Sequence, residues 1–163
     1  MLSRFPSVPG PVVGLAFLAP IALAQDAPPP PMHAVADEGV ASGHIEVPGF
    51  WPGLKVAVVH GDPSVPDQPY TLRLLFPDGY RFPPHWHPRA ENVTVLEGTF
   101  RLAIGRSFDA TKLQTYRPGD YLFIAAENPH YGGVRGRTVL QLHGIGPFEI
   151  HVVEGQEMSS ASR

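Results

Sequence analysis

Two histidines and a glutamate lie within seven residues of the chain, in the stretch GYRFPPHWHPRAENVTVLEG. His85 and His87 are separated by one residue, and Glu91 follows four residues after the second histidine. Pro83 and Pro84 directly precede the first histidine and favour an extended backbone over a helix. On a strand, side chains at i and i+2 point to the same side, so both imidazoles would face one space. Imidazole and carboxylate together suit a divalent first-row metal, with a fourth ligand supplied from elsewhere in the chain.

The same spacing resembles the first motif of the cupin superfamily. From Gly79 the chain reads glycine, five residues, His-x-His, three residues, glutamate, six residues, and then Gly98. A stretch similar to the second cupin motif begins at Gly119 (GDYLFIAAENPHYGGV), with His130 at its histidine position. It departs from the usual pattern at three places, where proline, glycine and asparagine are replaced by Ala125, Glu127 and Val134.

This resemblance spans about residues 70 to 153 and implies a metal site made by His85, His87, Glu91 and His130. Four protein ligands would leave positions on an octahedral ion for water, dioxygen or a chelating substrate, as a catalytic site requires. The implied cofactor is a divalent metal ion, whether Fe, Mn, Zn, Cu or Ni. The implied fold is a single jelly-roll β-barrel with the ligands pointing into its mouth.

The composition independently favours an all-β, single-domain fold. Twenty prolines and seventeen glycines accompany 43% hydrophobic residues, and no segment shows sustained helical periodicity. We expect about nine or ten short strands. Along the chain they are residues 54–60, 70–76, the motif strand with both histidines, 92–96, 99–104, 114–116, 121–124, 131–134, 138–143 and 148–153. Glu97-Gly98 is expected to be a tight turn that pairs residues 92–96 and 99–104 as a hairpin.

Three further residues are candidates for catalysis beside the metal. His143 and Gln141 share one face of the strand VLQLHG by alternation, and an interior position of that face would put His143 in the pocket. The alternative is a histidine satisfied on the surface or in the core. Tyr131 follows His130 directly and could serve as a proton donor. Trp86 lies between two ligands and would point away from the metal, into an outer layer or a subunit contact.

The ends of the chain predict export. Residues 1–24 resemble a signal peptide, with one arginine, an apolar run and a small-x-small cleavage site. The apolar run is interrupted by Pro20 and preceded by Pro11, and the stretch between these prolines is too short for a membrane anchor. Residues 25–43 form a Pro/Ala-rich linker, residues 44–153 the barrel and residues 154–163 a flexible tail. The expected location is therefore periplasmic or secreted, with no stable membrane insertion after cleavage.

Charge and cysteine content narrow the function further. The formal net charge is −3 without a basic cluster, which argues against nucleic acid as a partner. The chain has no cysteine, so disulfides and thiolate ligands are excluded. We expect an exported, metal-binding, homodimeric cupin that acts on a small molecule as an oxidoreductase of dioxygenase-like type. The alternative is a non-catalytic module that binds or senses a metal or small ligand.

Overall fold

The computed structural model describes residues 49–156, which form a sandwich of antiparallel strands. The expected signal peptide (1–24), the linker (25–43), the first residues of the expected barrel and all but the start of the expected tail lie outside this range. The strands are β1 (Lys55–His60), β2 (Pro69–Phe76), β3 (Arg81–Trp86), β4 (Glu91–Ile104), β5 (Gln114–Tyr116), β6 (Tyr121–Ile124), β7 (His130–Ile145) and β8 (His151–Val152), with a 3₁₀ turn at Ala110–Lys112. Within residues 49–156 there is no helix with the length and apolar character needed to cross a bilayer.

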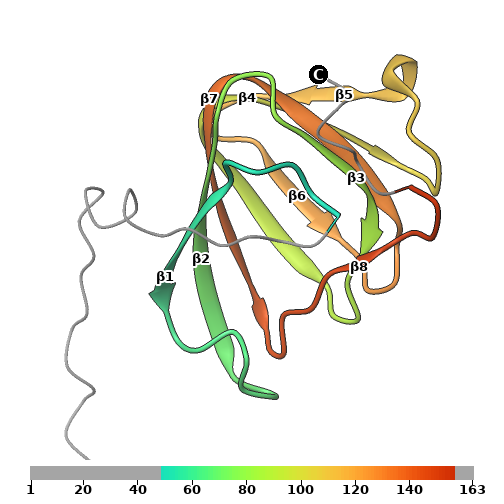
Figure 1. The fold of residues 1–163 in the computed structure, drawn as a ribbon. Helices are drawn as coiled ribbons and strands as arrows, with labels where there is room; N and C mark the ends of the chain where they lie inside the picture. The colour runs from blue at the N-terminus through green and yellow to red at the C-terminus, as the bar shows by residue number, and fades with distance from the viewer. Residues whose placement is uncertain (1–48, 157–163) are drawn as a thin grey trace, which may run out of the picture. The chain divides into compact units, whose positions relative to one another are not determined.

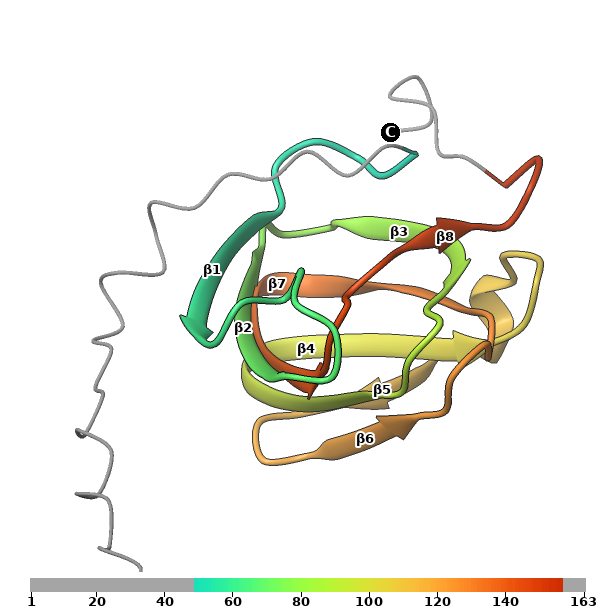
Figure 2. The same cartoon turned by 90° about the horizontal axis from the view of Figure 1, so that it is seen from below.

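Two long strands, β4 and β7, form the frame of the fold because they pair with each other along nearly their whole length. The second half of β7 also pairs with β2, while its first half pairs with β3. The first half of β4 pairs with β6 and its second half with β5. The edges are completed by β1 on β2 and by β8 on β3. In Figure 2, β3 and β8 lie at the top and β5 and β6 at the bottom, with β7 and β4 between them.

The result is an open jelly-roll barrel with two facing layers, as the sequence predicts. One layer holds β1, β2, the second half of β7, the first half of β4, and β6. The other holds β8, β3, the first half of β7, the second half of β4, and β5. Figure 1 shows β7 and β4 curving from one layer into the other.

The change of layer takes place at two glycines with positive φ. Gly98 in β4 has φ 78°, and the β4–β7 register shifts on both sides of it. A Cβ at this position would lie 2.3 Å from the carbonyl oxygen of Arg137, so only glycine fits. Gly136 in β7 has φ 72° opposite this bulge, and the buried Thr138 hydroxyl accepts the Thr99 amide proton there.

The expected hairpin at Glu97-Gly98 is therefore wrong. Residues 91–104 are one continuous strand with a bulge, and its second half pairs with β7 and β5 instead of with its own first half. In the same way, the two strands expected at 131–134 and 138–143 are one strand, β7. A bulge glycine and a turn glycine both need positive φ, so a local pattern does not separate them.

The hydrophobic core lies between the two layers, and strand alternation selects its members. On β2, Leu72, Leu74 and Phe76 face inward, and on β7 Leu140 and Leu142 do the same. The facing layer contributes aromatic residues, with the Phe82 and Phe100 rings 5.9 Å apart and nearly parallel. Toward one end of the barrel this core opens into a cavity that His85, His87, Glu91 and His130 line.

Candidate metal centre

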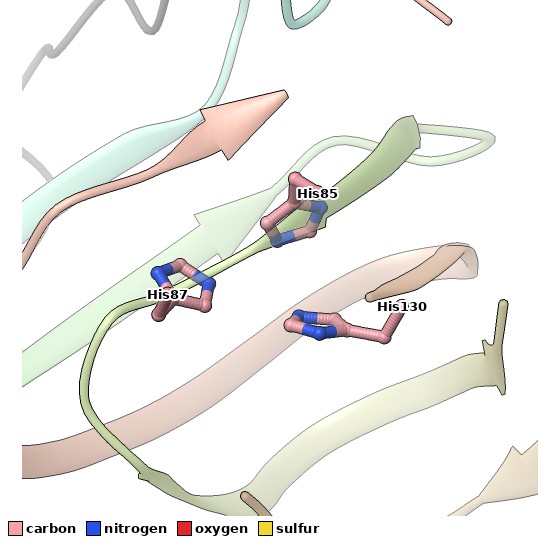
Figure 3. A group of neighbouring side chains, drawn as sticks. All are labelled: His85, His87 and His130. Carbon is pink, nitrogen blue, oxygen red and sulfur yellow. The ribbon is translucent and has the colours of Figure 1, made fainter. Parts of the chain in front are cut away.

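The four candidate ligands come from three places in the fold. His85 lies near the end of β3 and His87 just beyond that strand, while Glu91 begins β4 and His130 begins β7. His85 and His130 are direct partners across the β3–β7 ladder, and their rings are 4.2 Å apart. One ring nitrogen of each histidine lies within 4.8 Å of the others, and all three residues are buried. Figure 3 shows the three imidazoles turned toward a common space.

The bend of the β4–β7 ladder brings Glu91 to these histidines. Glu91 pairs with Gly144 at one end of that ladder, and His130 pairs with Ile104 at the other. Nevertheless, Glu91 Oε2 is 3.6 Å from His130 Nε2 and 3.2 Å from His87 Nε2. The ladder folds back at Gly98, so its two ends meet over the same cavity.

Backbone carbonyls fix the tautomer of all three histidines. The Nδ1 atom of His85 lies 2.7 Å from Pro83 O, that of His87 2.6 Å from Glu149 O, and that of His130 3.0 Å from Asn128 O. A carbonyl oxygen can only accept, so each Nδ1 carries the proton and donates it. Each neutral ring therefore carries no proton on Nε2, and the lone pair of that nitrogen can bind a metal. These contacts hold the rings in the orientation that ligating histidines need.

Burial sets the protonation of the metal-free site. It lowers the pKa of His85 well below the usual range, and the neighbouring His130 and His87 lower it further. Burial, followed by the nearby His130, lowers the pKa of His87 to about 3, and burial also lowers the pKa of His130. Burial raises the pKa of Glu91 to about 8. At neutral pH the contact between His87 and Glu91 thus joins a neutral imidazole to a carboxyl group that still holds its proton.

This donor set fits a divalent metal ion. Three neutral imidazole nitrogens and one carboxyl oxygen converge, and among the described residues no lysine or arginine lines the cavity to repel a cation. An uncompensated carboxylate is costly in such a place, and a cation is the partner that would let Glu91 ionise. Imidazole and carboxylate donors match zinc, iron, manganese, nickel and copper, and no soft sulfur ligand favours one of them.

The cavity around the site is apolar and small. Its volume is about 70 Å³, and every lining residue apart from the three histidines and Glu91 is aliphatic or phenylalanine. Three of these phenylalanines pack on the candidate ligands. The Phe148 ring stacks on His87 at 5.1 Å, and the Phe50 and Phe82 rings make T-shaped contacts with His85 at 4.9 and 5.5 Å. These contacts restrict ring rotation and exclude water from the imidazoles.

The departures from the second motif leave His130 in place because the backbone keeps its turn. Glu127 stands where glycine is usual, and it adopts the left-handed φ of 58° that glycine takes readily. Its amide proton is donated to His87 O at 2.8 Å, which ties the turn to the other ligand segment. The turn is thus retained, and the backbone strain of one non-glycine residue with positive φ costs of order 1 kcal/mol.

The three catalytic candidates do not line this cavity. Leu140 and Leu142 face inward on β7, so His143 and Gln141 lie on the outer face of the same strand. Gln141 accepts a hydrogen bond from Arg73 at 3.0 Å, and the His143 carbonyl accepts one from Asn92. Tyr131 also faces away from the cavity.

Two residues near the site, Tyr70 and Gly144, carry no motif signal. Tyr70 on β2 and Glu91 on β4 both pair with Gly144 of β7, so they share one inner row. A Cβ at Gly144 would lie 2.8 Å from the Tyr70 hydroxyl oxygen, so that glycine lets the ring cross the strand toward Glu91. Burial raises the pKa of Tyr70, and the charge of Glu91 adds to the shift, so the two groups are close. Only the cross-strand register reveals this relation.

Comparisons with known proteins agree with this architecture. Residues 72–146 match the cupin domain family. No protein with a curated function matches the sequence. The polyketide cyclase RemF from Streptomyces resistomycificus superposes with a TM-score of 0.61 at 20% identity, over 79% of this chain and 88% of that one. An RmlC-like cupin from Shewanella frigidimarina gives 0.53 at 16% identity, over 71% and 91%.

A salicylate 1,2-dioxygenase from Pseudaminobacter salicylatoxidans gives a TM-score of 0.55 at 10% identity, over 72% of this chain and 36% of that one. At such low sequence identities, the superpositions are evidence for the fold alone. The matched domain, the jelly-roll topology and the first-motif spacing lead to the same conclusion. The domain that contains residues 72–146 belongs to the cupin superfamily.

Proposed function

We propose that the protein is a metalloenzyme of dioxygenase-like type that acts on a small molecule, with His85, His87, Glu91 and His130 as the metal ligands. The observation that carries this proposal is the donor set itself. Three imidazoles with fixed tautomers and one carboxyl group converge at the wall of an apolar cavity. When bound, a divalent metal would supply Lewis acidity and, for a redox-active ion, electron transfer to dioxygen.

The lining of the cavity favours oxidative chemistry over chemistry that relies on protein acids and bases. Among the described residues, no titratable side chain lines the cavity besides the four candidate ligands. A lyase, isomerase or hydrolase mechanism needs a positioned general acid or base that is free to move a proton. Tyr70 is the nearest further candidate, and it stands behind Glu91 without lining the cavity. Oxidation at a metal that holds both substrate and dioxygen asks less of the surrounding side chains.

The protein residues would then act by orientation and by exclusion of water. The carbonyls of Pro83, Glu149 and Asn128 hold the imidazoles, and the stacked Phe148 keeps the His87 ring from turning. The apolar lining would contact an apolar substrate body. A cavity of about 70 Å³ limits that body to a small molecule, since typical ligand pockets are several times larger.

Metal analysis of purified variants tests the ligand set. His130→Ala should lose most of the bound metal, whereas His143→Ala, a histidine on the outer face of the same strand, should retain it. Substrate conversion by the iron-loaded protein tests the reaction type. It is measured over a panel of small apolar acids and phenols, first without oxygen and then in air, where oxygen uptake is followed as well. Full metal retention in His130→Ala would refute the ligand set. Substrate conversion that needs no dioxygen would refute the oxidative assignment.

A non-catalytic binding or sensing module is the second candidate, and the size of the cavity favours it. A small cavity with aromatic rings packed on its ligands suits retention of a ligand more than rapid exchange of substrate and product. Thermal-shift screening of the metal-loaded protein separates the two functions. A ligand that raises Tm and is recovered unchanged after prolonged incubation in air supports the binding module.

We also propose export, with residues 1–24 removed after translocation. The support is the sequence pattern of that segment, with its apolar run and small-x-small cleavage site. N-terminal sequencing of protein recovered from outside the cytoplasm should give Gln25 as the first residue. A first residue at Met1 would contradict the proposal.

A further inference from the structure

Three arginines gather on the outer surface of the barrel wall, on the opposite side from the cavity. Arg81 of β3 and Arg101 of β4 are both direct partners of Gly133 of β7. Directly paired residues of antiparallel strands point to the same side, so the two arginines flank the glycine in one cross-strand row. Phe82 and Leu102, the next residues along, line the cavity, which places the arginines outside. Arg135 lies two residues beyond Gly133 on the same strand.

These arginines line a groove of about 220 Å³. Gly133 forms the floor of the groove. A side chain is excluded at this position because a Cβ would lie 2.6 Å from Tyr80 O. One wall is the segment between β4 and β5, which folds over the outer face of the sheet. Phe108 of this segment packs on Tyr131 with ring centroids 5.1 Å apart, and the Tyr131 hydroxyl donates to Asp109 O at 3.3 Å. Tyr131 thus anchors the wall of the groove.

Within residues 49–156, carboxylates offset only part of the positive charge of this groove. Arg89 and Arg137 pair with Asp67 and Glu97, but none of the three groove arginines forms an ion pair with a carboxylate in residues 49–156. The one acidic residue in the groove, Asp78, accepts a hydrogen bond from the Gly136 amide at 2.6 Å. A chain with a formal charge of −3 therefore has a local excess of cations here.

One of the three guanidinium groups is also held in position. The Arg81 guanidinium carbon lies 6.0 Å from the centre of the Phe108 ring, which is within the range of a cation–π contact. Guanidinium groups present a planar fork of donors that matches the two oxygens of a carboxylate or phosphate. Arg81 and Arg101 approach the same glycine from two sides, so an anion over Gly133 could accept from both.

We propose that this groove is a binding site for an oxyanion, namely the carboxylate or phosphate group of a small molecule. Arg81 and Arg101 clasp the anion over Gly133, Arg135 adds charge at one end, and Phe108 and Leu113 offer an apolar surface for the rest of the molecule. The site is separate from the metal centre, because the β-sheet lies between the groove and the cavity. It stands independently of the proposed enzymatic function.

Isothermal titration of the metal-loaded protein with inorganic phosphate and, separately, with succinate tests this site. Sodium chloride at matched ionic strength corrects for screening. Saturable binding of either anion is expected, and the tighter of the two identifies the anionic group. Arg101→Gln should weaken that binding about tenfold or more, as expected for loss of a charge-assisted contact. Arg117→Gln removes an exposed arginine outside the groove and should leave binding unchanged.

The same titrations separate the groove from the metal as the anion site. Arg101→Gln should keep the metal content and Tm of the parent protein, which establishes that its fold and metal centre are intact. Unchanged anion affinity in Arg101→Gln would assign binding to the metal or to general charge and would overturn the proposal. Equal weakening in Arg101→Gln and Arg117→Gln, or no saturable binding of either anion at millimolar concentration, would overturn it as well.

Discussion

Metal binding to the metal-free protein should release protons in a pattern that Glu91 dictates. The buried carboxyl group has a pKa raised to about 8, so it holds its proton at neutral pH. The three histidines have lowered pKa values and hold no proton on Nε2. Ligation by the carboxylate requires Glu91 to ionise, whereas ligation by the neutral imidazoles displaces nothing.

The expected number of protons follows from these values. With Glu91 at about 8 and neutral histidines, binding releases about 1 proton at pH 6, about 0.9 at pH 7 and about 0.5 at pH 8. If burial had no effect, three histidines at their ordinary pKa would release about 2.3 protons at pH 6 and about 0.1 at pH 8. The two cases differ most at the ends of this range.

Calorimetric titration with Ni²⁺ or Mn²⁺ in buffers of different ionisation enthalpy counts the protons. Zn²⁺ is avoided because it can lower the pKa of its bound water to about 7 and add a proton of its own. Glu91→Gln has no proton to lose, so its release should fall to about zero at each pH even where its affinity is weaker. Release of two or more protons at about pH 6, or an unchanged count in Glu91→Gln, would refute this account of the site.

Four further outcomes are expected. Glu127→Gly should stabilise the protein by about 1 kcal/mol, measured by urea unfolding, because glycine relieves the left-handed strain; a loss of stability would contradict it. Gly98→Ala should destabilise by several kcal/mol more than Gly79→Ala, which has a similar positive φ but open space around the added Cβ; equal losses would show that the bulge is not tightly packed. The Tm of the metal-free protein should be highest near pH 6.5. Stability is lost as pH falls below about 6.5, where the histidines of the unfolded chain gain protons, and also as pH rises toward about 8, because Glu91 in the folded protein resists ionisation. A Tm that rises steadily to pH 9 would contradict this expectation. Protein exported natively should contain more zinc or copper, and the mature form made in the cytoplasm more iron or manganese, by elemental analysis; the same metal in both would mean that the site selects by geometry.

The candidate ligands could be predicted from the sequence because their spacing is local. His85, His87 and Glu91 lie in one short segment, and a single alternation rule places both histidines on the same side. The all-β fold follows from the short apolar runs and the many turn residues. His130 depends on the family resemblance, because its neighbourhood departs from the usual second motif.

Which side chains of β7 point into the core could not be predicted in the same way. Alternation groups His143 with Gln141, but it does not say which group of residues faces inward. That choice depends on pairing with β2 and β4, which lie far away in the sequence. The continuity of β4 through Gly98 was missed for a related reason, because the bulge is defined by Thr138 and Arg137 on the partner strand. The register that relates Tyr70 to Glu91 is equally non-local.

The ladder that doubles back at Gly98 gives the proposed metal a mechanical role. A bound ion would join residues 91 and 130 at the two ends of this ladder, and so would act as a reversible cross-link in a chain that has no cysteine. By the loop-closure relation used for disulfides, a link that closes a loop of this length and persists on unfolding restricts the unfolded chain by about 4 kcal/mol. Unlike a disulfide, it can be removed by a chelator and restored without any redox reaction. The domain could therefore be tightened or loosened by the metal supply of its surroundings alone.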